Sequence, residues 1–483
     1  MSNLLIEATA GSGKTTTVVN AYTYMRSKYR DKIRGNDEQK AVYEWCANNL
    51  PVTEKPKVAY FTFSKSNQES LEKRIYKGCK AWTFHGYGSS VLNRRTGFNK
   101  LNSNRSIDLV SELTGVRFNE LPNKSKWWSA ILYLRKLKLE FRYPTPENFL
   151  YVQTKYPDLG EIPYNDEIID MAKRLMNKMA TPNRCVEFVD MAWLGCLHID
   201  RPEYDIGFVD ECQDLSVLYL EIVKRACKNI VFCGDPNQAI MQFAGAHASM
   251  FGELRGIVDL QLPLKETFRC PPNIARLANQ IRPTARMRSA KTENGIEIQI
   301  PECDLLHHLR DKDYGHSIIC RTNAPLFGMA FKMLKQGIPA YMVGSDVIET
   351  LSSLVRATRA SSIKEFLAKL DMYTERLIEK SPNTAIYMED RADCLRLVAA
   401  ECQSVDQLIP TITRMFDSPQ NAAVCLSSIH RAKGLEWPNV YILNPPIPHP
   451  RGLEDPVQAE QEHNLSFVGV TRTSHTLVWS PKE

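Results

Sequence analysis

The sequence lacks the features that mark exported, membrane-embedded and disulfide-stabilised proteins. It has no run of about 18 apolar residues, and it opens on an apolar segment without a basic and then apolar leader. Its 13 cysteines are odd in number, scattered and never spaced as Cys-x-x-Cys, which argues against a disulfide framework and against a zinc module. We therefore expect a protein of the reducing cytoplasm, with no membrane among its partners.

A large excess of charge of one sign is also missing. The formal net charge is +6, hydrophobic residues make up 43% of the chain and charged residues 24%. These are ordinary globular values and exclude a disordered or fibrous class. The mild positive excess is compatible with a polyanionic partner but does not indicate one by itself. A chain of 483 residues is too long for one core and predicts about three or four domains or subdomains.

What is present begins with a candidate phosphate-binding loop. The apolar run Leu4–Ile6 leads into small residues and then Gly13-Lys14-Thr15, the order of strand, loop and helix that binds nucleoside triphosphates. We expect Lys14 to reach the β- and γ-phosphates and the Thr15 hydroxyl to hold Mg²⁺. The full motif has glycine where this chain has Ala8, so a simple tight turn is the alternative at this point. The residues expected to contact the nucleotide here are Ala10, Gly11, Ser12, Gly13, Lys14, Thr15 and Thr16.

Apolar, β-branched runs that alternate with helical patterns predict an α/β fold with parallel sheets. The runs lie at 58–63, 81–86, 206–210 and 229–234, and again at 317–321, 340–343, 423–428, 440–443 and 476–479. Helical patterns replace them at 93–185 and at 347–420. We therefore predict a first core at 1–92 and 186–262 and a second at 263–346 and 421–483, each with a mainly helical insertion. The basic and aromatic residues of 124–142 fit either a nucleic-acid contact or an amphipathic core helix, and we favour the helix.

Two acidic residues follow the apolar run at 206–209. Asp210 is placed to hold Mg²⁺ directly or through water, and Glu211 to polarise an attacking water. A solvated turn is the alternative, but it would leave Lys14 without a metal partner. After the next apolar run comes Gln238, a neutral donor and acceptor that suits contact with both a γ-phosphate and a water.

Further motifs follow along both predicted cores. In order, the motifs are Ala10-Gly11-Ser12-Gly13-Lys14-Thr15, Asp210-Glu211-Cys212-Gln213-Asp214, Gly234-Asp235-Pro236-Asn237-Gln238-Ala239-Ile240 with Phe243-Ala244-Gly245-Ala246, Glu266-Thr267-Phe268-Arg269, Ile318-Ile319-Cys320-Arg321-Thr322-Asn323, Ser428-Ile429-His430-Arg431-Ala432-Lys433-Gly434-Leu435-Glu436-Trp437 and Phe467-Val468-Gly469-Val470-Thr471-Arg472. Together they resemble the UvrD/Rep/PcrA-type superfamily 1 DNA helicases. The resemblance implies two RecA-like motor domains and an ATP- and Mg²⁺-dependent translocase and helicase that moves 3′ to 5′ on single-stranded DNA.

The resemblance also implies roles for single residues at the nucleotide. Phe268 matches the aromatic that stacks on adenine, and Glu436 matches a residue that contacts the sugar. Arg269 and Arg472 match two arginines that the second core extends to the γ-phosphate, where such residues stabilise transition-state charge. Gln238 matches the sensor that reports the γ-phosphate to the DNA-binding groove.

On the DNA side, the resemblance implies aromatic platforms for bases and polar contacts to the backbone. Phe63 and Phe243 match the platforms, on which bases stack without regard to sequence. The backbone contacts are matched by Thr83, Phe84, His85, Arg321, Ser428 and His430. The implied partners are single-stranded DNA and its junctions with duplex, with RNA an open alternative, for a monomer that acts in replication or repair.

Three departures from the family pattern qualify these expectations. The glutamine-containing segment that recognises adenine before the first strand is missing, which leaves strict preference for ATP open. Phe243-Ala244 stands where the family often has Trp-Arg. Both insertions are also short, as would suit a phage-encoded motor in the host cytoplasm. The alternatives are therefore a translocase that displaces proteins or remodels RNA without processive unwinding and, more distantly, a non-catalytic nucleic-acid binding module.

Overall fold

The chain forms two compact units, each built around one large sheet. The computed structural model describes residues 2–28, 30–51, 55–97, 100–156, 159, 162–181, 185–240, 250–310, 315–380, 385–416, 424–443, 453 and 456–481. The first unit comprises Met1–Ala8 and Gly13–Leu264, and the second comprises Thr9–Ser12 and Lys265–Glu483. Each contains a six-stranded sheet in which all paired strands are parallel. The prediction of an α/β fold with two RecA-like parallel-sheet domains is confirmed.

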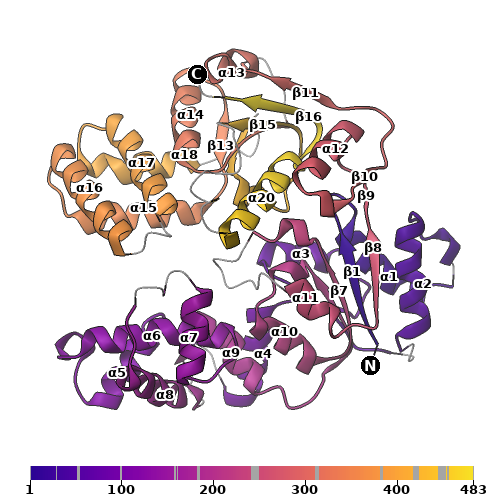
Figure 1. Cartoon of the computed structure of the whole chain (residues 1–483), viewed down its shortest axis with the longest axis horizontal. Helices are drawn as coiled ribbons and strands as arrows, with labels where there is room; N and C mark the ends of the chain where they lie inside the picture. The colour runs from indigo at the N-terminus through magenta and orange to yellow at the C-terminus, as the bar shows by residue number, and fades with distance from the viewer. Residues whose placement is uncertain are drawn as a thin grey trace. The chain divides into compact units, whose positions relative to one another are not determined.

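The sheet of the first unit brings distant segments of the chain side by side. In spatial order its strands are β3 (Lys80–Thr83), β2 (Val58–Thr62), β6 (Tyr204–Asp210), β7 (Cys227–Gly234), β1 (Asn3–Ala8) and β8 (Leu260–Leu264). Figure 1 shows β1, β7 and β8 running beside one another. Because the strands are parallel, their carboxyl ends share one edge, which is where open α/β sheets bind ligands.

Side-chain alternation along the strands supplies two buried faces. Leu4 and Ile6 of β1 belong to one apolar cluster, together with residues of the helices α1 (Lys14–Arg26), α2 (Asp37–Asn49) and α3 (Lys65–Glu72). Leu5, between them, belongs to the other, together with residues of α4 (Phe84–Thr96), α9 (Phe188–Leu197), α10 (Val217–Ala226) and α11 (Met250–Arg255). The sheet is therefore covered on both faces, as parallel sheets require.

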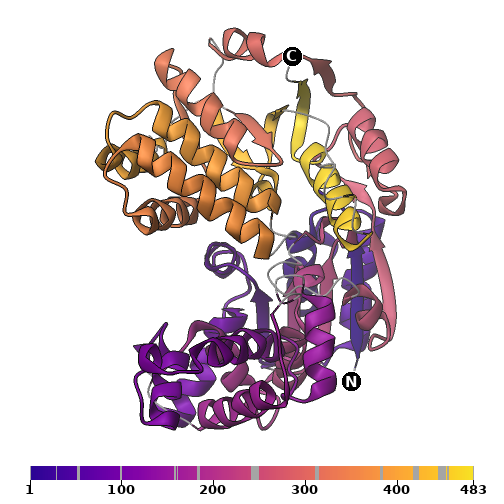
Figure 2. The same cartoon turned by 60° about the vertical axis from the view of Figure 1, so that its left-hand side comes forward.

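A helical insertion interrupts the first unit between α4 and α9. It consists of α5 (Arg105–Thr114), α6 (Lys124–Leu139), α7 (Pro146–Lys155) and α8 (Asp166–Ala180), with a short pair of strands, β4 (Lys100–Leu101) and β5 (Cys185–Val186). These helices cluster together in both views (Figures 1 and 2). Trp127, Ile131 and Leu134 of α6 are buried in the same apolar cluster as Leu5. The favoured interpretation of this segment as an amphipathic core helix is therefore confirmed for its apolar face.

The second unit repeats the plan. Its sheet has the order β11 (Ile296–Gln299), β16 (Thr473–Ser480), β15 (Trp437–Leu443), β12 (His316–Cys320), β14 (Val424–Ser428) and β13 (Ala340–Met342). A two-stranded pair, β9 (Glu266–Thr267) and β10 (Arg288–Ser289), precedes it. The other helices of this core are α12 (Pro272–Ile281), α13 (Glu302–Leu309), α14 (Ala324–Lys335), α19 (Ile429–Ala432) and α20 (Pro456–Val470).

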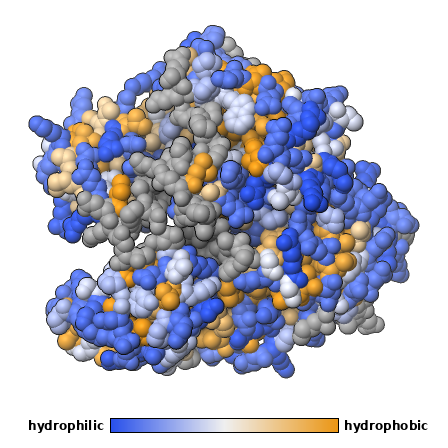
Figure 3. Space-filling model, in the orientation of Figure 1, coloured by the Kyte–Doolittle hydropathy of each residue, from blue (hydrophilic) through white to orange (hydrophobic). Residues whose placement is uncertain are grey.

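A second helical insertion lies between β13 and β14. It consists of α15 (Ser345–Thr358), α16 (Ile363–Lys380), α17 (Ala385–Ala400) and α18 (Leu408–Phe416), which Figure 2 shows packed as one bundle. Figure 3 shows hydrophilic side chains over most of the face in view, with apolar residues in scattered patches. Among the described residues, no helix combines the length and apolar character that a membrane crossing needs.

The structure corrects one expected strand. The sequence predicts a strand and turn over 81–86, but β3 ends at Thr83 and helix α4 begins at Phe84. The cause is local: the Thr83 hydroxyl accepts a hydrogen bond from the Gly86 N–H at 3.0 Å, which caps the first turn of the helix. Residues 84–86 are therefore helical.

Candidate functional site

The predicted phosphate loop has the backbone form that such loops need. Gly11 and Gly13 both have positive φ, +70° and +76°, in the region that L side chains rarely adopt. A Cβ on Gly11 would lie 2.5 Å from the Cβ of Arg269. Ala10 and Ser12 are buried, and the Ser12 hydroxyl donates to the Thr9 carbonyl at 2.9 Å. The loop then leads into the N-terminus of α1 at Lys14, where backbone N–H groups favour bound phosphate.

Two carboxylates meet the start of α1 at the carboxyl edge of the sheet. The Thr15 hydroxyl donates to Asp210 Oδ2 at 2.5 Å, and the Glu211 N–H donates to Asp210 Oδ1 at 3.0 Å. Burial, and after it the neighbouring Glu211 carboxylate, raises the pKa of Asp210. Glu211 itself has φ +57°, an uncommon conformation for a residue with a side chain and one that clusters at functional sites.

Lys14 lies in the field of these acidic groups. Burial by itself would lower the pKa of Lys14, but the negative charges of Glu211, Asp235 and Asp210 outweigh it and raise the pKa. Lys14 is therefore held as a cation beside the phosphate loop. Thr16, two residues after Lys14 in α1, is exposed, and its hydroxyl accepts a hydrogen bond from Arg74 Nη2 at 2.8 Å.

The residues present fit Mg²⁺. Thr15 and Asp210 supply hard oxygen atoms within hydrogen-bond distance of each other, and the raised pKa of Asp210 reflects a buried charge that a cation would stabilise. Among the described residues there is no group of three or more His, Cys, Asp or Glu side chains that could hold a metal ion. Mg²⁺ does not need one, since it is usually bound by one or two carboxylates together with substrate phosphates and water.

A chain of hydrogen bonds links Glu211 to the predicted sensor Gln238. Gln213 Nε2 donates to Glu211 Oε2 at 2.6 Å, and Gln213 Oε1 accepts from the Asp235 N–H at 3.0 Å. Gln238 Nε2 then donates to Asp235 Oδ2 at 2.6 Å. Gln213 and Asp235 were not among the predicted site residues. The sequence signal for Gln213 is Gly234. A Cβ on Gly234 would lie 2.5 Å from Gln213 Oε1, so glycine at 234 allows the Gln213 side chain to lie this close to the main chain.

In the second unit, three of the predicted nucleotide residues lie around Thr471. Arg269 donates from Nε to Glu436 at 2.6 Å and from Nη1 to the Thr471 carbonyl at 3.1 Å. Arg472 is buried, and its guanidinium group donates to the Val468 carbonyl and to the Thr471 hydroxyl. The structure thus places both arginines at the junction of α20 and β16.

Phe268 lies beside the tip of the phosphate loop. Its side chain is 45% exposed, and its N–H donates to the Gly11 carbonyl at 2.9 Å. An exposed ring next to a phosphate loop is free to stack on a base, so the geometry suits the role that the resemblance implies for it.

An aromatic cluster lies at the carboxyl end of β2 and β3. Phe63, Phe84 and His85 surround Tyr219, and the centroids of the Phe84 and Tyr219 rings are 4.6 Å apart. Phe84 is 1% exposed and belongs to the core, whereas Phe63 is partly exposed. Burial lowers the pKa of His85 to about 4, so its ring is neutral at neutral pH.

The structure adds Phe188 to this cluster. Its ring stacks on His85 with a centroid distance of 4.1 Å, and the residue is 60% exposed. Exposed aromatic rings on which bases can stack are typical of surfaces that bind single strands. Phe188 was not among the predicted site residues, because none of the motifs includes it.

The predicted contacts of the second unit also lie together. β12 and β14 pair so that Cys320 is opposite Ser428, which brings Arg321 next to the start of α19. Burial, followed by the charge of Arg321, lowers the pKa of His430 to about 3. Arg321 makes a buried two-pronged ion pair with Glu462 of α20, with contacts of 2.5 to 3.1 Å. Phe243, the other predicted platform, lies outside the described residues.

Comparison with known proteins gives two family matches. The model of the UvrD/REP helicase N-terminal domain matches residues 1–257, and that of the UvrD-like helicase C-terminal domain matches residues 423–479. F-box DNA helicase protein 1 of Schizosaccharomyces pombe is 24% identical over 507 residues, which cover 92% of this chain and 54% of that protein. ATP-dependent DNA helicase PcrA of Bacillus subtilis is 23% identical over 626 residues, covering 98% of this chain and 80% of that protein. The chain thus spans about half the length of the first relative.

Proposed function

The chain belongs to the UvrD/REP helicase family, and we propose that it is an ATP-dependent motor that moves along single-stranded DNA and separates duplex. One observation carries the proposal: Lys14, Thr15, Asp210 and Glu211 meet at one edge of the first sheet. Family relatives are named as ATP-dependent DNA helicases, which supports the same activity. The 3′ to 5′ direction rests on the family resemblance.

Within the proposed nucleotide site, each residue has a separate role. We propose that Lys14 and the N–H groups of 10–16 bind the β- and γ-phosphates, and that Thr15 and Asp210 hold Mg²⁺, which neutralises charge on the phosphates. Glu211 orients the attacking water and accepts its proton. Phe268 stacks on the base, Glu436 contacts the sugar, and Arg269 and Arg472 stabilise the transferring phosphoryl group.

Arg269 now donates to Glu436, and Arg472 to carbonyl groups of its own unit. Both roles therefore require these bonds to be exchanged when nucleotide binds. The hydrogen-bonded chain from Glu211 through Gln213 and Asp235 to Gln238 is a route by which the state of the γ-phosphate reaches the DNA surface.

For the track, we propose that Phe63, His85 and Phe188 meet the bases in the first unit and that Phe243 is a further platform. The proposed contacts to the DNA backbone are Thr83, Arg321, Ser428 and His430. The Phe84 side chain lies in the core and supports this segment. Backbone contacts carry no sequence information, so binding should be independent of sequence and sensitive to salt. A monomer in the reducing cytoplasm is the simplest form of this motor.

A translocase that displaces proteins without processive unwinding is the second candidate. It stays a candidate because both helical insertions are short. A strand-displacement assay run beside an assay that removes streptavidin from a biotinylated strand separates the two activities.

Steady-state hydrolysis of each of the four nucleoside triphosphates, alone and with single-stranded DNA, duplex or RNA, tests the proposal. We expect hydrolysis of ATP that single-stranded DNA stimulates. Lys14→Ala and Glu211→Gln should each lower the rate by about 10² or more, since each removes a group aimed at developing charge or at the attacking water. Lys40→Ala, which removes an exposed charge on α2, is the matched control. A wild-type rate of hydrolysis in Lys14→Ala or in Glu211→Gln would contradict the assignment of the nucleotide site.

A further inference from the structure

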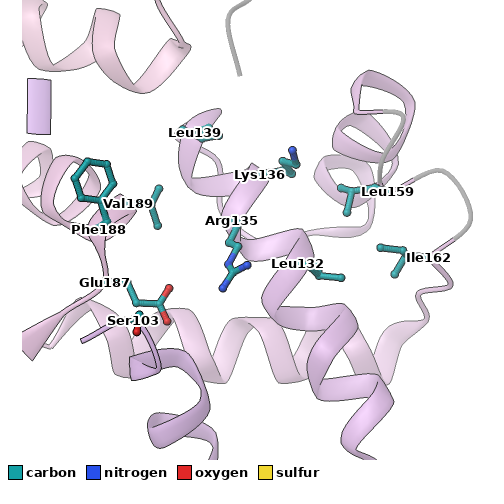
Figure 4. A pocket seen from close by; sticks show the side chains of 10 residues that line it. All are labelled: Ser103, Leu132, Arg135, Lys136, Leu139, Leu159, Ile162, Glu187, Phe188 and Val189. Atoms are coloured by element: carbon teal, nitrogen blue, oxygen red, sulfur yellow. The ribbon is translucent and has the colours of Figure 1, made fainter. Parts of the chain in front are cut away.

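The helical insertion of the first unit contains a hollow that none of the proposed roles uses. Its volume is about 510 Å³, and it lies between α6, the segment after α7 and the start of α9. Its lining residues are Ser103, Leu132, Arg135, Lys136, Leu139, Leu159, Ile162, Glu187, Phe188 and Val189. Figure 4 shows Phe188 and Val189 on one side, Leu159 and Ile162 on the other, and Arg135 between them.

The hollow is apolar on its walls and basic along α6. Six of its ten described lining residues are leucine, isoleucine, valine or phenylalanine, while Arg135 and Lys136 are basic. The ammonium group of Lys136 lies 4.5 Å from the centroid of the Tyr156 ring, which holds this side chain in place. An apolar wall beside cationic groups suits a ligand that has a flat ring and a negative charge.

Among the described lining residues, the one acidic side chain is already engaged. Glu187 is 5% exposed, and its Oε1 accepts the Ser106 N–H at 2.7 Å, in the first turn of α5. A carboxylate at a helix N-terminus is stabilised by the helix dipole, so its charge is partly neutralised. Arg135, by contrast, is exposed and makes no hydrogen bond or ion pair to the described residues. Among the described lining residues, Arg135 is therefore the positive charge that the hollow offers to a ligand.

Phe188 joins the hollow to the aromatic cluster. Its ring stacks on His85 and also lines the hollow, and 60% of the residue is exposed. A strand that passes over the aromatic cluster at His85 and Phe188 therefore reaches the mouth of the hollow next.

We propose that this hollow binds one nucleotide of the single-stranded track, with its base against the wall formed by Leu132, Ile162 and Val189 and its phosphate on Arg135. The inference rests on the proposed function and extends it, because it makes the helical insertion part of the strand-binding surface. It also assigns the two faces of α6: the apolar face packs in the core, and the basic face binds nucleic acid.

Fluorescence anisotropy with labelled oligothymidylates, in which one base at a time is removed, tests the proposal in the full chain. In the wild type, the abasic position that falls at the hollow should weaken binding roughly tenfold, since stacking of a base contributes about 1–3 kcal/mol. Ile162→Phe, which fills the hollow, should abolish the effect of that one position, while Ile162→Val, which leaves space, should keep it. Val189→Phe fills the hollow from the other wall and replaces Ile162→Phe if thermal unfolding shows that the latter is not folded.

Arg135→Ala tests the phosphate contact through the salt dependence of binding. The slope of log affinity against log salt should become shallower by about 0.7, the value for one phosphate contact on a single strand. Arg174→Ala removes the same charge from an exposed position on α8 that does not line the hollow, and should leave the slope unchanged.

Two results overturn the inference: an unchanged slope in Arg135→Ala, or an abasic effect that survives in the folded variant whose hollow is filled. The proposed function still stands in either case if the wild type binds single-stranded DNA and hydrolyses ATP. Absence of any binding by the wild type overturns both.

Discussion

The Thr15 hydroxyl donates a 2.5 Å hydrogen bond to Asp210, although the two residues are 195 positions apart in the chain. Thr15 follows β1 and Asp210 ends β6, and the two strands are separated in the sheet by β7. All three are parallel, so their carboxyl ends meet at one edge. This pair is the geometric centre of the proposed nucleotide site, and it defines the first prediction.

Thr15→Val should impair the use of Mg²⁺, because it keeps the shape of the side chain but removes the oxygen. We expect the Mg²⁺ concentration for half-maximal ATP hydrolysis to rise at least about tenfold. Thr15→Ser, which keeps the hydroxyl, should stay close to wild type. A Mg²⁺ titration at saturating ATP measures both, and equal behaviour of the two variants would contradict the metal assignment.

Phe188→Ala should weaken binding of single-stranded DNA. Loss of one stacking platform costs about 1–3 kcal/mol, or roughly 5- to 150-fold in affinity. Phe188→Tyr preserves the ring on His85 and should bind as wild type does. The rate of ATP hydrolysis at saturating DNA should change little in either variant, since Phe188 does not touch the nucleotide site. A fall in that rate with unchanged affinity would argue against a role in the track.

Arg321→Ala should destabilise the second unit. Arg321 and Glu462 form a buried ion pair, and removal of one partner leaves the other charge buried and uncompensated, at a cost of about 3–5 kcal/mol. Arg396→Ala, which breaks exposed pairs with Asp371 and Asp393, should cost no more than about 1 kcal/mol. Thermal unfolding compares the two. If Arg321→Ala instead keeps wild-type stability and loses only DNA affinity, its main role is contact with the strand.

Gly234→Ala should uncouple the sensor. The added Cβ would lie 2.5 Å from Gln213 Oε1 and 2.7 Å from Cys212 Sγ, so Gln213 must move away from the Asp235 N–H. We expect a smaller stimulation of ATP hydrolysis by single-stranded DNA. Gly252→Ala is the control, because a Cβ on Gly252 meets nothing within 4 Å. The measurement is the ratio of the ATP hydrolysis rates with and without single-stranded DNA. An unchanged ratio in Gly234→Ala would refute the proposed coupling through Gln213.

Neutral His85 should make the first unit sensitive to acid. Its pKa is lowered from 6.5 to about 4 by burial, so between these values the unfolded chain binds the proton and the folded chain does not. Stability is therefore lost as the pH falls from about 6.5 to about 4, by at most about 1.4 kcal/mol per pH unit. Tyr219 beside it stays neutral, because burial raises its pKa to about 12.

His85→Phe removes the titrating group and keeps a ring on Phe188. Denaturant unfolding at a series of pH values should show a shallower loss of stability for this variant than for wild type. Parallel curves would mean that His85 is not neutral in the folded state.

Much of this protein could be predicted from the sequence, because local patterns carry the information. Apolar, β-branched runs predicted β2, β6, β7 and the strands of the second sheet other than β11 to within a few residues, since a short apolar run is itself the signal for a buried strand. The strand β11 was not predicted. The phosphate loop was predictable for the same reason: the positive φ of Gly11 and Gly13 is a local demand that glycine meets.

Only the tertiary structure decided what depends on packing between distant segments. The start of α4 at Phe84 depended on a cap that periodicity does not reveal. The close approach of Gly234 identifies Gln213, and the stacking on His85 identifies Phe188. The ion-pair partner of Arg321 is Glu462 on α20, 141 positions away in the chain. Residue type and spacing thus predict candidate side chains for the chemistry. Their partners and their exposure depend on contacts that exist only once the sheets and helices have packed.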